Sequence, residues 1–163
     1  MGVVYKAIDT TLDRVVAIKM VHAPEILGEG VDLIEVQVRF LREARAAARI
    51  KSRHVAQVLQ LGTRDESEAY IVMEVLHGVA LSKLMHKGGP MKPARVVHIA
   101  RQICRVMQSA HDLGVVHRDL KPANVMLINE EGDADFVKIL DFGVAKLTDD
   151  TQSRCRGHRR RGC

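Results

Sequence analysis

The sequence predicts an α+β fold, in which short strands and one helix are followed by a long apolar helix and a second strand pair. Four strand-like segments in the first half alternate with polar turns, at residues 2–8, 14–21, 55–61 and 69–76. Two longer segments have the apolar spacing of helices, at residues 32–50 and 92–113, and a short helix is expected at 81–87. The last strand pair is expected at 125–128 and 136–140, with residues 129–135 as its turn.

The composition is that of a globular protein with one hydrophobic core. The chain has 163 residues, of which 47% are hydrophobic and 28% charged, which is an ordinary balance. The net charge of +5 comes from residues 154–163, which contain five arginines and no acid. Without them 20 basic residues face 20 acidic ones. This distribution speaks against nucleic-acid binding.

No segment of the sequence predicts export or insertion into a membrane. No apolar run approaches the length of a membrane span, and the N-terminus lacks the order of a signal peptide. The three cysteines are an odd number, which fits a reducing compartment, and we expect a cytoplasmic protein. Cys104 lies in an apolar helical pattern, which predicts a buried free thiol. Cys155, His158 and Cys163 form only a weak metal-binding pattern.

Two short segments of the second half carry groups suited to phosphoryl transfer. Residues 117–124 read His-Arg-Asp-Leu-Lys-Pro-Ala-Asn, and residues 141–143 read Asp-Phe-Gly. A carboxylate such as Asp119 accepts a proton from a hydroxyl, and a lysine such as Lys121 neutralises charge on a phosphoryl group. Asn124 and Asp141 offer the hard oxygen atoms that Mg²⁺ prefers.

These two motifs, preceded by Val16-Ala17-Ile18-Lys19, resemble the signatures of the protein kinases, and specifically the eukaryotic-type serine/threonine protein kinases that bacteria also carry. The resemblance covers residues 2 to about 153 and keeps the family's motif order. It implies a two-lobe fold that is incomplete, with a small antiparallel sheet lobe plus one helix, and the first part of a helical lobe.

The resemblance also implies where the domains divide. Residues 1–76 correspond to the N-terminal lobe without its first strand and most of its glycine-rich loop. Residues 77–153 correspond to the start of the C-terminal lobe, and 154–163 form an aberrant basic tail that we predict is read out of frame. Seen this way the domain is truncated at both ends. The missing helices would pack on residues 92–113, so we expect apolar faces of that helix to be exposed.

Several residues of the first lobe correspond to the family's phosphate-binding positions. Gly2 is the last glycine of the glycine-rich loop, and Lys19 would grip the α- and β-phosphates of ATP. Glu43 would pair with Lys19. By themselves, these residues have simpler interpretations: Lys19 as a solvent-facing strand residue, and Glu43 as a solvated partner of Arg39.

The adenine site implied by the resemblance draws on both lobes. Its apolar walls would come from Val4, Ala17 and Met126, with Met73 as the gatekeeper. The backbone carbonyl of Glu74 and the backbone of Leu76 would bind the adenine edge.

The resemblance implies transfer of the γ-phosphoryl group of ATP to serine or threonine hydroxyls of proteins. Asp119 would orient and deprotonate the hydroxyl, and Lys121 would contact the phosphoryl group. Asn124 and Asp141 would hold Mg²⁺. Two alternatives stay open: an inactive kinase-like fragment that acts as a binding module, and a small-molecule phosphotransferase such as an antibiotic kinase, which shares part of the loop motif.

Overall fold

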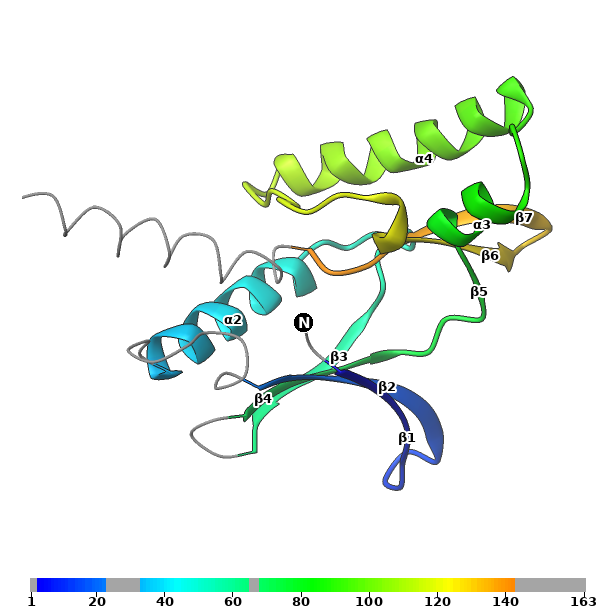
Figure 1. The fold of residues 1–163 in the computed structure, drawn as a ribbon. Coiled ribbons are helices and arrows are strands. Elements are labelled where there is room, and N and C mark those ends of the chain that lie inside the picture. The colour runs from blue at the N-terminus through cyan, green and yellow to red at the C-terminus, as the bar shows by residue number, and fades with distance from the viewer. Residues whose placement is uncertain (1–2, 23–32, 65–67, 143–163) are drawn as a thin grey trace, which may run out of the picture.

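The computed structural model describes residues 3–22, 33–64 and 68–142, and their fold is α+β, as predicted. Strands β1 (Val3–Asp9), β2 (Arg14–His22), β3 (Val58–Thr63) and β4 (Glu68–Glu74) form one antiparallel sheet in the order β1-β2-β4-β3. Figure 1 shows this sheet at one end of the molecule and helix α4 at the other. The four predicted strands are therefore all present.

Helix α2 (Leu33–Ala48) packs on this sheet with the apolar face that its helical spacing predicts. Phe40 and Ala44 from the helix lie against Ala69 and Ile71 of β4, and all four are buried. Phe40 is completely inaccessible to solvent. Truncating a phenylalanine in such a site usually costs about 3–5 kcal/mol, so this contact fixes the helix against the strand that leads to Glu74.

A second sheet has the order β5-β6-β7 and consists of β5 (Gly78–Ala80), β6 (Val125–Glu130) and β7 (Asp133–Ile139). The β6–β7 hairpin turns at Glu131 and Gly132, whose φ angles are 52° and 84°. Two successive positive φ angles are typical of a tight type I′ turn. The predicted turn at 129–135 was too long for this reason, since the strands continue through its polar ends.

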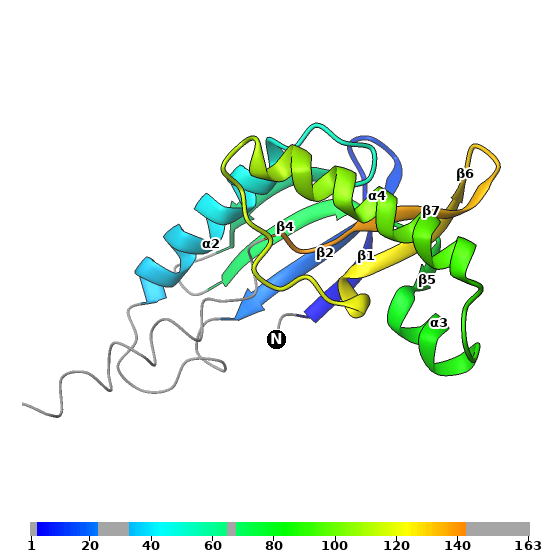
Figure 2. The ribbon, with the colours of Figure 1, turned by 90° about the horizontal axis from the view of Figure 1, so that it is seen from above.

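Strand β5 was not predicted, and a glycine makes it possible. A Cβ atom at Gly78 would lie 2.2 Å from the carbonyl oxygen of Leu127 and 2.7 Å from a side-chain carbon of Ile128. Only glycine lets the chain approach β6 this closely. Helices α3 (Leu81–Lys87) and α4 (Pro93–His111) follow at the predicted positions. Figures 1 and 2 show α2 and α3 on opposite sides of the molecule.

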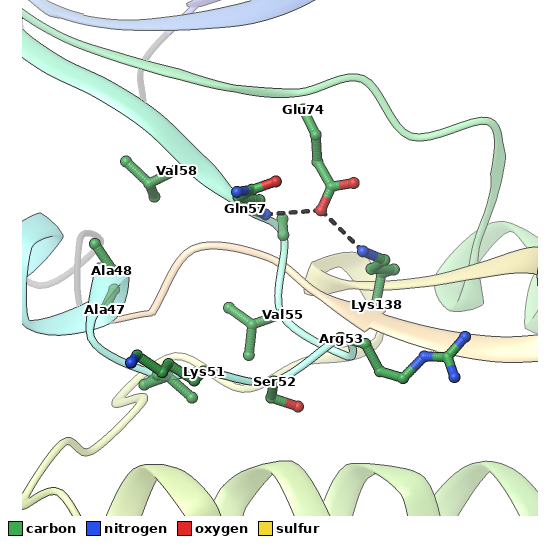
Figure 3. Close-up of a pocket in the computed structure, with 12 residues that line it drawn as sticks. Ala47, Ala48, Lys51, Ser52, Arg53, Val55, Gln57, Val58, Glu74 and Lys138 are labelled. Atoms are coloured by element: carbon green, nitrogen blue, oxygen red, sulfur yellow. Dashed lines mark hydrogen bonds and ion pairs between the residues drawn. The ribbon is translucent and has the colours of Figure 1, made fainter.

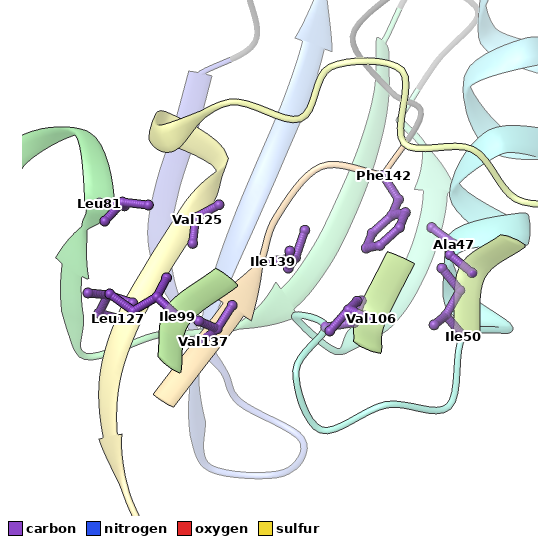
Figure 4. Close-up of a cluster of buried hydrophobic side chains, with 12 residues drawn as sticks. Ala47, Ile50, Leu81, Ile99, Val106, Val125, Leu127, Val137, Ile139 and Phe142 are labelled. Carbon is purple, nitrogen blue, oxygen red and sulfur yellow. The ribbon is translucent and has the colours of Figure 1, made fainter. Parts of the chain in front are cut away.

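The larger hydrophobic core lies between α4 and the β6–β7 hairpin. Ile99, Val106 and Ala110 of the helix are buried together with Val137 and Ile139 of β7. Figure 4 shows Ile99, Val106, Val137 and Ile139 in one cluster with Phe142, with Ala47 near the end of α2 and with Ile50 just after that helix. The core therefore joins the first half of the chain to the strand that precedes Asp141.

Helix α4 buries one face and exposes the other, although its apolar residues cover both. Val96 and Val97 are 44% and 57% exposed, in line with the expectation of exposed apolar surface. Cys104 lies on the same side and is exposed, so the prediction of a buried thiol was wrong. The apolar pattern around Cys104 marked the helix correctly, but this side of it faces away from β7.

The segment before β3 connects the two sheets. The third strand begins at Val58, whereas the sequence predicted Val55. Val55 instead forms an isolated parallel bridge with Ile139. The amide of Ile139 donates to the carbonyl of His54 at 2.7 Å, and the amide of Ala56 donates to the carbonyl of Ile139 at 3.0 Å. The apolar character of this segment thus reflects docking onto β7.

Candidate active site

The loop between α4 and β6 brings a carboxylate, an ammonium group and an amide together. The Nζ atom of Lys121 lies 2.7 Å from Oδ2 of Asp119. The Nδ2 atom of Asn124 donates to the backbone carbonyl of Asp119 at 2.9 Å and to its Oδ2 at 3.2 Å. A single 3-10 turn, Pro122–Asn124, allows this contact, because it bends the chain back within three residues.

Buried hydrogen bonds hold this loop against the segment that ends in Asp141. His117 is 2% exposed, and its Nε2 donates to the carbonyl of Leu140 at 2.9 Å. The amide of Leu140 in turn donates to the carbonyl of Asn124 at 2.9 Å. The His117 ring also lies 4.7 Å from the Phe142 ring, centroid to centroid. Asp119, Asn124 and Asp141 are therefore carried by backbone segments that are hydrogen-bonded to each other.

The first sheet contributes Lys19, which reaches across to this segment. Its Nζ lies 2.6 Å from Oδ1 of Asp141, and the two side chains are only 13% and 27% exposed. The simpler interpretation of Lys19 as a solvent-facing strand residue is therefore wrong. Asp141 has a φ of 56°. Positive φ is uncommon for a residue other than glycine, and such backbone strain is concentrated at functional sites.

The predicted adenine wall lies on the same sheet face as Lys19. Val4 is paired directly with Lys19, and Ala17 is paired directly with Met73, in antiparallel register. Directly paired residues project to one face, as do residues two apart on a strand. The structure thus puts Val4, Ala17, Lys19 and Met73 on one face, with Val4 59% exposed. Met126 comes from β6 of the other sheet.

For the other predicted site residues the structure describes little that bears on their predicted roles. Gly2 lies outside the described residues. Glu43 belongs to α2, but its side chain is also outside the described part of the chain, so its predicted pairing with Lys19 stays a prediction. Leu76 is half-buried in the link between β4 and β5. The predicted role of Glu74 concerns its backbone carbonyl as an adenine contact, and it stays a prediction.

Sequence reasoning missed what the Glu74 side chain does. Its Oε1 accepts hydrogen bonds from the amide of Gln57 at 2.7 Å and from Nζ of Lys138 at 2.9 Å. Neither partner was singled out in the sequence. Strand alternation was the available signal, because a residue next to Met73 on the same strand must point to the opposite face.

The electrostatics of the loop keep Asp119 charged. The hydrogen bond from Lys121 lowers the pKa of Asp119, and the charge of Lys121 and a hydrogen bond from Asn124 act in the same direction, against the effect of burial. A carboxylate with a lowered pKa is a weak base. It is suited to accept a hydrogen bond from a hydroxyl group and to orient it.

Comparison with known proteins defines the class. The model of the protein kinase domain family matches residues 1–159. The chain therefore belongs to the protein kinase family, as its motifs indicate. In the described residues no helix is long and apolar enough to cross a membrane.

The named relatives are bacterial serine/threonine-protein kinases. The chain is 38% identical to pkn3 of Myxococcus xanthus over 151 residues, which is 93% of this chain and 27% of the relative. It is 37% identical to PknE of Mycobacterium bovis over 150 residues, which is 92% of this chain and 25% of the relative. The chain thus spans about a quarter of the length of these curated relatives.

Solved kinase structures share the fold. The PknI kinase domain of Mycobacterium tuberculosis superposes with a TM-score of 0.73 at 27% identity, over 91% of this chain and 55% of that one. Rad53 in complex with AMP-PNP gives a TM-score of 0.71 at 26% identity, over 88% of this chain and 35% of that one. The fold is that of an incomplete protein kinase domain.

Proposed function

We propose that the chain is the nucleotide-binding and catalytic part of a protein serine/threonine kinase, which transfers the γ-phosphoryl group of ATP to hydroxyl groups of proteins. The observation that carries this proposal is the contact between Lys19 and Asp141, 2.6 Å long, beside a loop that presents Asp119 and Lys121. Chain segments far apart in sequence converge there on groups that suit phosphoryl transfer.

The reaction would depend mainly on positioning. Asp119 accepts a hydrogen bond from the attacking hydroxyl and aims it at the γ-phosphorus, and it takes the proton as the new oxygen–phosphorus bond forms and the bond to ADP breaks. Its lowered pKa makes it a poor base before that point. Lys121 moves from Asp119 to the phosphoryl oxygens, which are the more negative partner in the transition state.

The residues present suit a magnesium ion. Asn124 uses its Nδ2 on Asp119, which leaves the side-chain carbonyl oxygen of Asn124 as a ligand. Asp141 provides a carboxylate, and the Leu140–Asn124 hydrogen bond keeps the two residues on adjoining segments. When bound, Mg²⁺ would neutralise charge on the β- and γ-phosphates. Among the described residues no cluster of three or more His, Cys, Asp or Glu exists, which suits a cation that takes its other ligands from phosphates and water.

Nucleotide binding would use both sheets. Lys19 would leave Asp141 for the α- and β-phosphates, supported by the side chain of Glu43, with Gly2 near the phosphates. Val4, Ala17 and Met126 would enclose the adenine, beside the gatekeeper Met73. The backbone of Glu74 and Leu76 would bind the adenine edge. Rad53, a structural neighbour, is known in complex with AMP-PNP, which supports this assignment.

A direct test measures ATP binding and phosphoryl transfer by residues 1–163. We expect ATP to bind with Mg²⁺, and Lys19→Met to weaken binding by about tenfold or more, because a part-buried cation opposite the phosphates is lost. Lys19 lies in a polar contact, so the variant should keep the fold. Equal ATP affinity in Lys19→Met and the parent chain would refute the proposal.

The acceptor is tested in the same preparation. Radiolabelled phosphate should reach serine and threonine of a generic protein such as casein, and Asp119→Asn should lose about 10²-fold or more of that transfer. An aminoglycoside acceptor serves as the comparison. Transfer to the aminoglycoside with none to protein would favour a small-molecule phosphotransferase instead.

A further inference from the structure

A second lysine–carboxylate pair lies on the far side of the link between β4 and β5. The Nζ atom of Lys138 lies 2.9 Å from Oε1 of Glu74, and the two side chains are 10% and 27% exposed. Figure 3 shows the pair with Gln57 at the edge of a pocket. The cavity has a volume of about 340 Å³ and is also lined by Ala47, Val55 and Val58. Nothing in the proposed reaction uses Lys138.

Strand geometry places Glu74 opposite the predicted adenine wall. Glu74 is the last residue of β4, and its neighbour Met73 is paired with Ala17. Successive side chains on a strand project to opposite faces. The Glu74 side chain therefore leaves the strand on the side away from Ala17 and Met73.

The other partner of this pair lies beside the predicted adenine floor. Lys138 on β7 is paired directly with Met126 on β6. Directly paired residues of antiparallel strands share a face, with Cβ atoms about 4.5–5.5 Å apart. One face of the second sheet thus carries Met126 for the adenine and Lys138 for the back of the β4–β5 link.

Backbone hydrogen bonds reinforce the link at the same point. The amide of Gln57 donates to Oε1 of Glu74 at 2.7 Å, and the amide of Glu74 donates to the carbonyl of Gln57 at 3.0 Å. The segment that carries Gln57 is bound to β7 through Ala56 and His54. Glu74 is therefore held from the loop side and from the strand side, and both supports rest on β7.

We propose that Lys138 is a positioning residue for the adenine edge. It does not contact the nucleotide. Through the Glu74 carboxylate it fixes the direction in which the Glu74 carbonyl and the Leu76 backbone point. This inference rests on the proposed function, because those two backbone groups are its adenine contacts.

The pair can be weakened without a change of volume. Lys138→Met keeps most of the aliphatic stem and removes only the cation. Glu74→Gln keeps an acceptor for the Gln57 amide and removes the charge. Arg95→Met is the matched control, since Arg95 also ties a helix to the β7 strand, through Asp135 at 2.7 and 2.8 Å, but lies away from the β4–β5 link.

The experiment uses residues 1–163 and two measurements. The first is amide hydrogen exchange at Gln57, Glu74 and Leu76, with amides around Ile71 in the middle of β4 as the internal reference. In Lys138→Met we expect exchange at the first group to rise about three- to tenfold, somewhat more than an exposed ion pair gives, because Glu74 keeps its hydrogen bond from the Gln57 amide. The Arg95→Met control should leave these amides unchanged.

The second measurement separates the adenine edge from the phosphates. Adenosine and inorganic tripolyphosphate are titrated separately. Lys138→Met should weaken adenosine binding about three- to tenfold and leave tripolyphosphate within about twofold. The Glu74→Gln/Lys138→Met double variant should lose no more than Lys138→Met alone, because residues that act as one pair are not additive.

Each other outcome decides against the inference. Unchanged exchange in Lys138→Met means that the pair does not fix the link. Faster exchange with unchanged adenosine affinity means that the pair is structural and does not position the nucleotide. Equal losses for adenosine and tripolyphosphate mean general destabilisation. If the parent chain binds no ATP or adenosine, the proposed function itself fails, and this is recognised because the parent and not the variant is deficient.

Discussion

Two lysine–carboxylate pairs connect the first sheet to β7 and to the segment that follows it, and they have nearly the same burial but different surroundings. Lys19 lies 2.6 Å from Asp141, and Lys138 lies 2.9 Å from Glu74. The lysine side chains are 13% and 10% exposed, and both carboxylates are 27% exposed. Contact distance and burial therefore do not tell the two pairs apart.

The neighbours of each carboxylate make the difference. Glu74 already accepts a backbone hydrogen bond from Gln57 in addition to Lys138, so its charge is compensated within the protein. Asp141 has Lys19 as its ion-pair partner and directly follows Leu140, whose amide donates to the carbonyl of Asn124. A carboxylate and a side-chain amide oxygen on adjoining segments are ligands that suit a cation from outside. The Lys19–Asp141 pair is therefore suited to separate when phosphates and a cation bind, and the Lys138–Glu74 pair is suited to remain intact.

The largest expected effect distinguishes the two pairs by how much phosphoryl transfer is lost when the carboxylate of each pair is replaced by an amide. Asp141→Asn should reduce phosphoryl transfer by on the order of 10²-fold or more, the usual effect of losing a positioned electrostatic group. Glu74→Gln should change it by no more than about fivefold, the value of an exposed to half-buried pair. Single-turnover transfer to casein measures both. Similar losses in the two variants would abolish the distinction drawn between the pairs.

The sequence predicted the first pair's residues and not the second. Lys19 and Asp141 belong to short motifs whose order carries information along the chain. Glu74 and Lys138 are 64 residues apart, and their contact depends on the registers of β4 and β7, which no local pattern specifies. Strand alternation could have indicated the direction of the Glu74 side chain but not its partner.

The fold was predictable where apolar periodicity was long, and less so where single residues decide. Helices α2, α3 and α4 matched their expected ranges within a few residues. Strand β5 has three residues and depends on the missing side chain of Gly78, which a pattern of apolar residues does not reveal. Cys104 was misjudged because apolar spacing identifies a helix but not which of its faces finds a partner.

A smaller effect, on stability, is expected at Gly78, where the link between β4 and β5 ends. Gly78→Ala would bring a methyl group to 2.2 Å from the carbonyl oxygen of Leu127. The obstacle is backbone, so β5 must move away from β6. We expect a loss of about 1–3 kcal/mol in the free energy of unfolding, the usual cost of overpacking. Urea denaturation measures it.

Gly88→Ala is a suitable control, since its nearest new contact, the Leu84 carbonyl, lies at 3.0 Å, without the closer clash found at Gly78. If Gly78→Ala proves as stable as the parent chain, β5 is not pinned to β6, and the path of the link is set by Glu74 and Lys138 alone.

The smallest effect tests the charge state of Asp119 in the loop between α4 and β6. Lys121 lowers the pKa of Asp119 chiefly through its hydrogen bond, so Lys121→Met should raise that pKa toward the ordinary aspartate value. The sign for stability follows from linkage. A carboxyl group with a lowered pKa in the folded state stabilises the fold above its unfolded-state pKa, and this contribution disappears as the pH falls through the folded-state pKa. The parent chain should therefore keep the contribution to lower pH than Lys121→Met does.

Carboxyl-carbon NMR titration of Asp119 measures its pKa directly. Asp133 serves as the internal comparison, because its pKa is also lowered, but by hydrogen bonds from the Asp135 amide and His98 that act against its burial. Lys121→Met should move Asp119 and leave Asp133 in place. A parallel shift of both residues would mean that the substitution alters the fold, and no shift of either would mean that Lys121 does not hold Asp119 in solution.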